Sequence, residues 1–194
     1  MKDTSVPPDH FERIYANDPD PWRYATSPYE KRKYAATLAA LPRLRFNRAF
    51  EPGCSIGVLT RMLARRCGRL LASDMSEISL DHARARCRGV RNIHFRRMRI
   101  PAEWPTGTFD LIVLSEVLYY QSRRDVWATA RKTLRCLRAE GVVVMVHWLG
   151  VTGTARGGDQ VARQFINQTT RLRRVARRRT GSYRLDVLHR GCLR

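Results

Sequence analysis

AFEPGCSIGVLT, residues 49–60, joins an apolar lead-in and a carboxylate to two glycines, and it decides how the rest of the chain is interpreted. Gly53 and Gly57 permit backbone conformations that other residues rarely adopt, and they allow a ligand to approach closely. A dinucleotide-binding loop has G-x-G-x-x-G spacing, whereas three non-glycine residues separate these two glycines. By itself the stretch fits either a cofactor loop or a tight turn from a strand into a helix.

Segments of strand and helix character alternate along the rest of the chain. FDLIVLSE (109–116) is a nearly unbroken apolar run, which is typical of a strand at the centre of a parallel sheet. Strand character is also found in 48–53, 69–74, 92–98 and 141–148, and helical spacing of apolar residues in 56–67, 76–87, 123–137 and 157–170. Five β-α units in succession predict an α/β fold with a Rossmann-like, doubly wound, mostly parallel sheet.

Local signals place the ends of two helices. Ser76 is suited to cap the helix over 76–87, because a serine side chain accepts a hydrogen bond from the backbone of the first turn. The segment AEG (139–141) is expected to cap the end of the helix over 123–137. The apolar face of that helix is predicted to consist of Val126, Trp127, Ala130, Leu134 and Leu137.

The two ends of the chain differ from the alternating part. Alternating stretches at 172–180 and 182–190 meet at Thr180-Gly181-Ser182, which predicts a C-terminal antiparallel hairpin. At the other end an amphipathic helix over 28–41 follows a polar, aromatic segment, 15–27. We expect one domain over 1–194, with 1–45 as an N-terminal helical cap or lid segment and 46–194 as the Rossmann-like core.

Charge and cysteine content limit the possible environments and partners. The formal charge is +20, and 33 of the 37 cationic residues are arginine, six of them within 171–179. Such a field attracts polyanions, although arginines scattered over every segment also fit biased codon usage. The five cysteines lack zinc-site spacing, so reduced thiols and no metal are expected. No run of eighteen apolar residues exists, which favours a soluble, cytoplasmic protein without membrane contact.

Two carboxylates favour a cofactor loop over a plain turn. Glu51 precedes Gly53 by two residues, and Asp74 closes the second predicted strand, seventeen residues after Gly57. A carboxylate at the second position can accept both hydroxyls of a ribose, while the loop lacks the spacing for a pyrophosphate. These residues favour a ribosyl ligand without phosphates. S-adenosyl-L-methionine (SAM) is such a ligand, because Glu51 suits its cationic amino group and Asp74 its ribose.

EPGCSIG (51–57) resembles the first motif of class I SAM-dependent methyltransferases, whose usual form is acid-x-Gly-x-Gly-x-Gly; Ser55 replaces the middle glycine. The chain is similar in particular to the nodulation protein S-like methyltransferases. The similar stretches are FERIYANDPDPWRYATSPYEKRKY (11–34), EPGCSIGVLT (51–60), ASD (72–74), AEWPTGTFDLIVLSEVLYY (102–120), VHW (146–148) and YRLDVL (183–188). The resemblance implies N-methylation of a small acceptor, most simply the amine of an amino sugar or oligosaccharide.

The resemblance also implies a set of cofactor residues. It places Gly53, Cys54, Ser55 and Gly57 around the methionine part of SAM, Asp74 at the ribose, Met75 beside the adenine, and Leu114 and Ser115 at the sulfonium. The family commonly has an acid after the third strand, whereas this chain offers only a backbone carbonyl near Arg97 or Met98. Tyr24, with Trp22 and Tyr29, is a candidate for a lid over the cofactor.

Three residues near the ends of the fourth and fifth predicted strands are candidates for catalysis. Glu116 ends the strongest predicted strand, where a base that removes a proton from the acceptor is expected. One of Tyr119 and Tyr120, with Tyr120 preferred, is expected to shape the acceptor pocket. His147 ends the fifth predicted strand. The structural alternatives are a turn cap for Glu116, core packing for the tyrosines and a hydrogen-bonded structural residue for His147.

Two other functions remain open from the sequence. One is a nucleic-acid methyltransferase that uses its arginine-rich surface, although the [ND]-P-P-[YFW] turn that holds a flipped base is absent where SEVLYY stands. The other is a non-catalytic module that binds SAM or an acidic partner. The expected partner is a small-molecule acceptor, and the expected oligomeric state is a monomer or a weak dimer.

Overall fold

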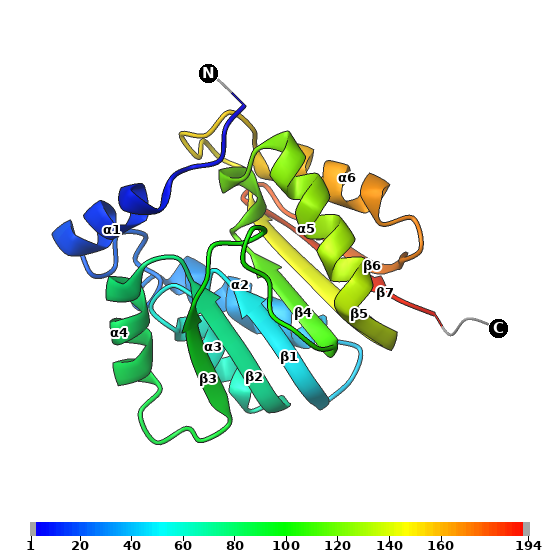
Figure 1. Ribbon diagram of the computed structural model, residues 1–194, viewed down its shortest axis with the longest axis horizontal. Coiled ribbons are helices and arrows are strands. Elements are labelled where there is room, and N and C mark those ends of the chain that lie inside the picture. The colour runs from blue at the N-terminus through cyan, green and yellow to red at the C-terminus, as the bar shows by residue number, and fades with distance from the viewer. Residues whose placement is uncertain (1–2, 192–194) are drawn as a thin grey trace. The chain divides into compact units, whose positions relative to one another are not determined.

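The computed structural model describes residues 3–191, so Cys192 lies outside the described residues (Figure 1). The chain divides into two compact units. We call Pro7–Arg99 the N-terminal unit, and Met1–Val6 together with Ile100–Arg194 the C-terminal unit.

The N-terminal unit is built on three parallel strands in the order β3-β2-β1. Its elements are α1 (Pro8–Asn17), α2 (Pro28–Ala39), β1 (Phe46–Pro52), α3 (Val58–Ala64), β2 (Cys67–Asp74), α4 (Glu77–Arg86) and β3 (Ile93–Arg97). Helix α3 packs on β2, and α4 packs on β2 and β3. In the register Glu51 lies opposite Ala72, so β1 and β2 end at one edge of the sheet.

Serine caps begin two helices of this unit. The Ser76 side chain accepts a hydrogen bond from the backbone N–H of Ser79 at 3.2 Å, which confirms the predicted cap of α4. Ser27 does the same for α2 from Glu30, and Pro28 occupies the first helical turn. Within α2, Lys33 is almost fully buried and forms an ion pair with Glu30 at 2.8 Å.

Helix α1 was not anticipated, because its last residues were interpreted as part of the polar, aromatic segment 15–27. Pro8 provides a favourable first helical position. Phe11 and Tyr15, four residues apart, are both buried, and Ile14 lies between them on the same side of the helix. The helical spacing was therefore present in the sequence, and α1 packs against α4 (Figure 1).

The C-terminal unit contains four strands in the order β4-β5-β7-β6 among its described residues. Its elements are β4 (Phe109–Ser115), η1 (Leu118–Tyr120), α5 (Arg123–Cys136), β5 (Leu137–Trp148), α6 (Gly158–Gln168), β6 (Arg173–Arg179) and β7 (Tyr183–His189). Strands β4 and β5 are parallel, while β7 pairs antiparallel with both β5 and β6. The predicted hairpin is confirmed.

The predicted helix cap at 139–141 is wrong. Helix α5 ends at Cys136 and β5 begins at Leu137, so the segment belongs to the strand. The strand register shifts there, and Glu140 has a φ of 57°. A Cβ on Gly141 would lie 2.7 Å from the carbonyl oxygen of Arg138. The glycine therefore serves a crowded β-bulge rather than a helix terminus.

The predicted apolar face of α5 is also partly wrong. Its buried residues are Val126, Thr129, Ala130, Thr133 and Cys136. Trp127 is 42% exposed, and the guanidinium of Arg131 lies 4.5 Å from the centre of its ring. Helical spacing from Val126 selects positions three and four residues on, and the small threonines occupy these positions against the core.

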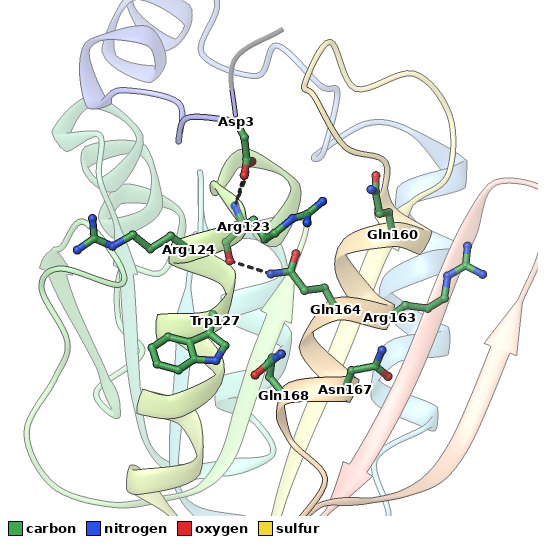
Figure 2. Close-up of a pocket in the computed structure, with 9 residues that line it drawn as sticks. All are labelled: Asp3, Arg123, Arg124, Trp127, Gln160, Arg163, Gln164, Asn167 and Gln168. Carbon is green, nitrogen blue, oxygen red and sulfur yellow. Dashed lines mark hydrogen bonds between the residues drawn. The ribbon is translucent and has the colours of Figure 1, made fainter.

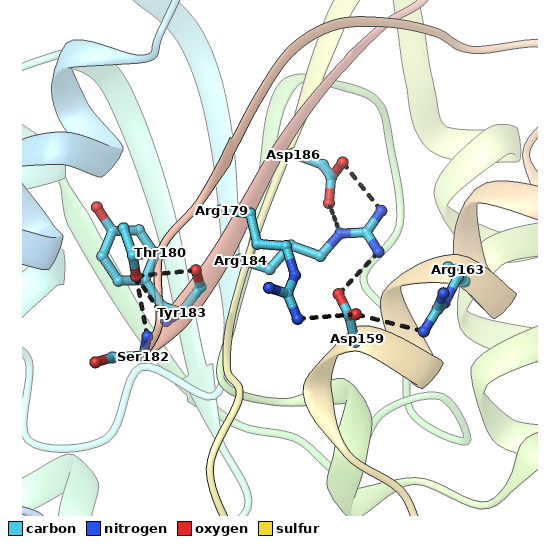
Figure 3. A network of polar contacts seen from close by, with 8 residues as sticks. All are labelled: Asp159, Arg163, Arg179, Thr180, Ser182, Tyr183, Arg184 and Asp186. Carbon is cyan, nitrogen blue, oxygen red and sulfur yellow. Dashed lines mark hydrogen bonds and ion pairs between the residues drawn. The ribbon is translucent and has the colours of Figure 1, made fainter.

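A polar network joins the start of α6 to the C-terminal hairpin (Figure 3). Asp159 accepts a hydrogen bond from Arg184 at 3.1 Å and forms ion pairs with Arg163 and Arg179. Arg184, itself buried, also donates to both carboxylate oxygens of buried Asp186. Partial burial alone would raise the pKa of Asp159, but its three arginine partners hold it below the usual value. The network fixes α6 against β6 and β7.

No described helix is long and apolar enough to cross a membrane. Within residues 3–191 no group of three or more histidine, cysteine or acidic side chains is placed to hold a metal ion. The four cysteines in this range, at positions 54, 67, 87 and 136, are free and buried.

Candidate functional site

The loop after β1 has an unusual backbone. Gly53, Ser55 and Gly57 have φ angles of 70°, 49° and 78°, so three of its five residues are left-handed. Ser55 stands at the position of the middle glycine in the motif that this loop resembles. Its φ lies in the small left-handed region open to L-residues, and its hydroxyl is bonded to Tyr15 within the protein at 2.6 Å. The turn directs the backbone N–H of Ser55 to a carboxylate oxygen of Asp74, at 2.9 Å.

Gly57 is required by packing within the protein. A Cβ at this position would lie 3.0 Å from both Cα and Cβ of Ala83 in α4. Cys54 is likewise directed inward, because its side chain packs with Ala72 and Leu80. Burial raises the pKa of the Cys54 thiol well above its usual value. Any ligand contact from Cys54 and Gly57 would therefore come from their backbone.

Glu51 is a buried acid at the end of β1. It is only 2% exposed, and its Oε2 has no hydrogen-bond partner among the described residues. Burial raises its pKa to about 8; the Thr60 hydroxyl opposes this rise and the charge of Asp74 adds to it. An uncompensated buried carboxyl is costly unless a cation reaches it. Glu51 therefore fits a ligand that carries a positive charge.

Asp74 closes β2 at the same edge. Its two carboxylate oxygens accept the backbone N–H groups of Ser55 and Ser76, at 2.9 and 3.1 Å. Burial raises its pKa, although these bonds oppose the rise. Each carboxylate oxygen retains a further lone pair, so Asp74 can also accept hydroxyl groups of a ligand.

Met75 and Met98 lie beside Asp74 and are half-buried. The backbone N–H of Met98 donates to the carbonyl of Asp74 at 2.8 Å, and Arg97 donates its Nε to the carbonyl of Met75 at 3.1 Å. The structure thus gathers the cofactor candidates of the N-terminal unit at the carboxyl edge of β1, β2 and β3.

Two of the three aromatic candidates for a lid, Trp22 and Tyr24, form a cluster with α1. Trp22 stacks on Tyr24 with ring centres 5.6 Å apart and meets the edge of Tyr15 at 5.6 Å. Tyr24 also donates its backbone N–H to Asp20 at 2.7 Å. Helix α1, which was not predicted, also contributes, because its Glu12 and Tyr15 contact the loops after β2 and β1.

In the C-terminal unit, Glu116 ties the end of β4 to the end of β5. Its Oε2 accepts the hydroxyl of Tyr119 at 2.6 Å and the backbone N–H of Trp148 at 2.8 Å. The residue is 9% exposed and has a φ of 59°. A carboxylate held by two donors in a left-handed turn is fixed in orientation, which serves either a turn cap or a positioned base.

Tyr120 and His147 have different surroundings. Burial, with the nearby charge of Glu116, raises the pKa of Tyr120, although the Tyr119 hydroxyl opposes the rise. Tyr120 therefore stays neutral and can donate a hydrogen bond. His147 is fully buried, with its ring 5.8 Å from that of Tyr119. At the end of β4, Leu114 is buried in the core and Ser115 is half-buried.

A cavity of about 800 Å³ lies between α5 and α6 (Figure 2). It is lined by Asp3, Arg123, Arg124, Trp127, Gln160, Arg163, Gln164, Asn167 and Gln168. Asp3 accepts the first N–H of α5, and Gln164 donates to the carbonyl of Arg123 at 2.7 Å. None of the predicted site residues lines this cavity. Its lining consists mainly of polar and charged side chains of α5 and α6.

Comparison with known proteins identifies first the class and then the family. The fold is that of class I methyltransferases: a crystal structure of the N-methyltransferase NodS from Bradyrhizobium japonicum WM9 with S-adenosyl-L-homocysteine matches with a TM-score of 0.82 and 25% identity, over 94% of this chain and 97% of that one. Residues 9–187 match the family model described as nodulation protein S (NodS). The chain belongs to the nodulation protein S family.

Individual relatives agree with this assignment. Nodulation protein S of Bradyrhizobium diazoefficiens is 38% identical over 123 residues, which are 60% of this chain and 54% of the relative. Nodulation protein S of Rhizobium tropici is 34% identical over 102 residues, or 52% and 43% of the two chains. The matched part therefore spans about half the length of these curated relatives.

Proposed function

We propose that the protein is a SAM-dependent N-methyltransferase whose acceptor is the amine of a small molecule, an amino sugar or oligosaccharide. The observation that carries the proposal is Glu51, a buried carboxyl whose Oε2 lacks a hydrogen-bond partner among the described residues. It precedes the loop in which Ser55 donates its backbone N–H to Asp74. SAM has a cationic amino group for Glu51 and ribose hydroxyls for Asp74. Membership of the nodulation protein S family supports the same cofactor and an amine acceptor.

The remaining candidates then have defined roles. The backbone of Gly53, Cys54, Ser55 and Gly57 would enclose the amino-acid part of SAM, with Met75 and Met98 at its adenine and Tyr24 in the covering segment. Leu114 and Ser115, through the end of β4, would border the sulfonium. We treat residues 1–194 as one functional domain, with the segment before residue 46 as its cap.

SAM supplies an electrophilic methyl group when it is bound. The protein's part is to align the acceptor nitrogen with that group and to remove a proton from an acceptor that arrives charged. Glu116 would take this proton, since Tyr119 and Trp148 fix its carboxylate. Tyr120, kept neutral by burial, would donate a hydrogen bond to the acceptor. His147 is fully buried and would support the site from within.

Binding and transfer can be tested on the full chain. Calorimetry should show that both SAM and S-adenosyl-L-homocysteine bind, and a labelled-methyl assay should show transfer to glucosamine oligomers with a free terminal amine. Fully N-acetylated oligomers are the matched control and should accept no label. Absence of binding by either compound would refute the cofactor assignment; binding with equal labelling of both oligomers would refute the amine acceptor.

Two variants test the site. Asp74→Asn should weaken SAM binding, since the charge and one of the two acceptor oxygens are lost, at about 1.5–3 kcal/mol for a hydrogen bond to a charged group. Glu116→Gln should leave SAM affinity nearly unchanged and slow methyl transfer. Full activity of Glu116→Gln would remove Glu116 from the mechanism, and unchanged affinity of Asp74→Asn would refute the ribose assignment.

A further inference from the structure

Two serines hold Asp74, and each of them is also bonded to α1. Ser55 and Ser76 donate their backbone N–H groups to the two oxygens of the Asp74 carboxylate. The hydroxyl of Ser55 is paired with the hydroxyl of Tyr15 at 2.6 Å. The hydroxyl of Ser76 donates to Glu12 at 2.8 Å. Each serine therefore bonds Asp74 through its backbone N–H and α1 through its hydroxyl.

The contact of Glu12 is suited to its place at the start of α4. Its Oε1 accepts the backbone N–H of Glu77 at 2.9 Å, in the first turn of a helix whose dipole favours negative charge. Arg97 lies 3.8 Å from the same carboxylate. Burial alone would raise the pKa of Glu12, but these bonds lower it below its usual value. Glu12 is therefore ionised at neutral pH, and its hydrogen bonds are charge-assisted.

The bond to Tyr15 gives a structural reason for serine, rather than the usual glycine of the motif, at position 55. A glycine at this position would satisfy the left-handed backbone, but it would have no hydroxyl for Tyr15. Serine at this position has a strained left-handed backbone, and its hydroxyl forms a hydrogen bond with Tyr15 of α1, 40 residues earlier in the chain.

We propose that α1 is a latch on the cofactor loops that slows the release of SAM and S-adenosyl-L-homocysteine. Tyr15 and Glu12 are its positioning residues. They act on Asp74 through Ser55 and Ser76. The inference rests on the proposed role of Asp74 at the ribose. The bonds from Tyr15 and Glu12 restrict the movement of both serines and therefore of the Asp74 carboxylate. When these bonds break, the loops around Asp74 can move and the ligand can leave. A purely structural α1 would instead act through the packing of Phe11 and the Tyr15 ring, which is independent of the two polar contacts.

The test is the dissociation rate of S-adenosyl-L-homocysteine from the full chain, measured by stopped-flow displacement. Tyr15→Phe keeps the ring and removes only the hydroxyl, and Glu12→Gln keeps the shape and removes the charge. Each should speed release by about three- to ten-fold, the value of one hydrogen bond. Arg13→Ala is the matched control on the exposed side of α1, where Arg13 donates to the carbonyl of Asp9 in its own helix, and should leave release unchanged.

A double-mutant cycle separates the latch from general loosening of the helix. Because Tyr15 acts through Ser55, Tyr15→Phe combined with Ser55→Ala should speed release no more than either change alone. Thermal melting verifies that each variant is folded. Unchanged release in Tyr15→Phe and Glu12→Gln, or multiplied effects in the double variant, would overturn the latch alone. No binding by the wild-type chain would overturn the latch together with the cofactor assignment.

Discussion

Glu51 shows how a single buried carboxyl makes stability depend on pH. Its pKa is raised to about 8 because burial penalises the charged form. In the unfolded chain the same group loses its proton at about pH 4.3. Between these two values the folded protein holds a proton that the unfolded protein has lost. This group's contribution to stability is therefore complete at low pH and declines as the pH rises towards 8.

We expect Glu51→Gln to become progressively more stable than the wild-type chain as the pH rises. Glutamine keeps the shape of the side chain and cannot ionise, so the difference in free energy of unfolding should grow by about 1.4 kcal/mol per pH unit inside this window. Urea denaturation at about pH 5.5 and about pH 7.5 measures the difference. Glu103→Gln, at an exposed position, is the control. A difference independent of pH would show that Glu51 ionises normally.

The sequence could predict the acids of the site but not the contacts that hold them. Glu51 and Asp74 were found because each follows a predicted strand at a spacing that suits a ribosyl ligand, and the carboxyl ends of parallel strands meet at one edge. The bonds of Ser55 to Tyr15 and of Ser76 to Glu12 join residues 40 and 64 positions apart. No local pattern encodes such pairs, because they depend on how α1 packs against α4.

At the scale of elements, one glycine sets how closely α3 approaches α4. Gly57 precedes α3 with a φ of 78°, and a Cβ there would lie 3.0 Å from Ala83. Gly89 follows α4 with a similar φ of 84°, but a Cβ there would meet nothing within 4 Å. The two glycines have the same backbone requirement and differ in their surroundings.

This pair of glycines separates backbone strain from crowding. Gly89→Ala should destabilise the fold by about 1 kcal/mol, because an alanine is placed in the left-handed region. Gly57→Ala should cost about 1–3 kcal/mol more, since α4 must also move away from the new methyl group. Chemical denaturation of both variants under one set of conditions gives the comparison. Equal losses would mean that α4 yields without cost.

The elements that the sequence predicted well have one dominant signal. The apolar run 109–116 became β4, and the hairpin around Gly181 was set by the turn and its alternating flanks. The errors lie where two signals compete. Gly141 follows a helix and has the residue type of a helix cap, yet the apolar run after it extends the strand back to Leu137. Trp127 is the largest apolar residue of α5, yet smaller side chains face the core.

At the scale of the whole molecule, the positive charge is spread widely and is densest on one strand. All residues of β6 are exposed. Arg174 and Arg179 form ion pairs with Asp186 and Asp159, whereas Arg173, Arg177 and Arg178 form no ion pair with the described residues. Close spacing of unpaired cations favours polyanions, so the nucleic-acid alternative can be tested at this strand.

We expect weak, salt-dependent binding of single-stranded RNA that is centred on β6. Changing Arg173, Arg177 and Arg178 together to Gln should reduce the slope of log affinity against log salt by about two, as expected for three phosphate contacts. The matched control changes three exposed arginines outside β6, Arg32, Arg88 and Arg91, to Gln. Fluorescence anisotropy at several salt concentrations compares the two. Equal reductions in slope would show that the field is diffuse and that β6 is no binding surface.

The strand order β4-β5-β7-β6 sets the sequence in which the C-terminal unit can form during synthesis. β6 pairs only with β7 among the described strands, yet β7 follows it in the chain. β6 therefore leaves the ribosome with no partner and waits until residues 183–189 have emerged and paired with β5. An unpaired strand can pair with the same strand of another chain and so lead to aggregation. The arginines of β6 oppose such pairing during that delay, because like charges on the two strands repel each other.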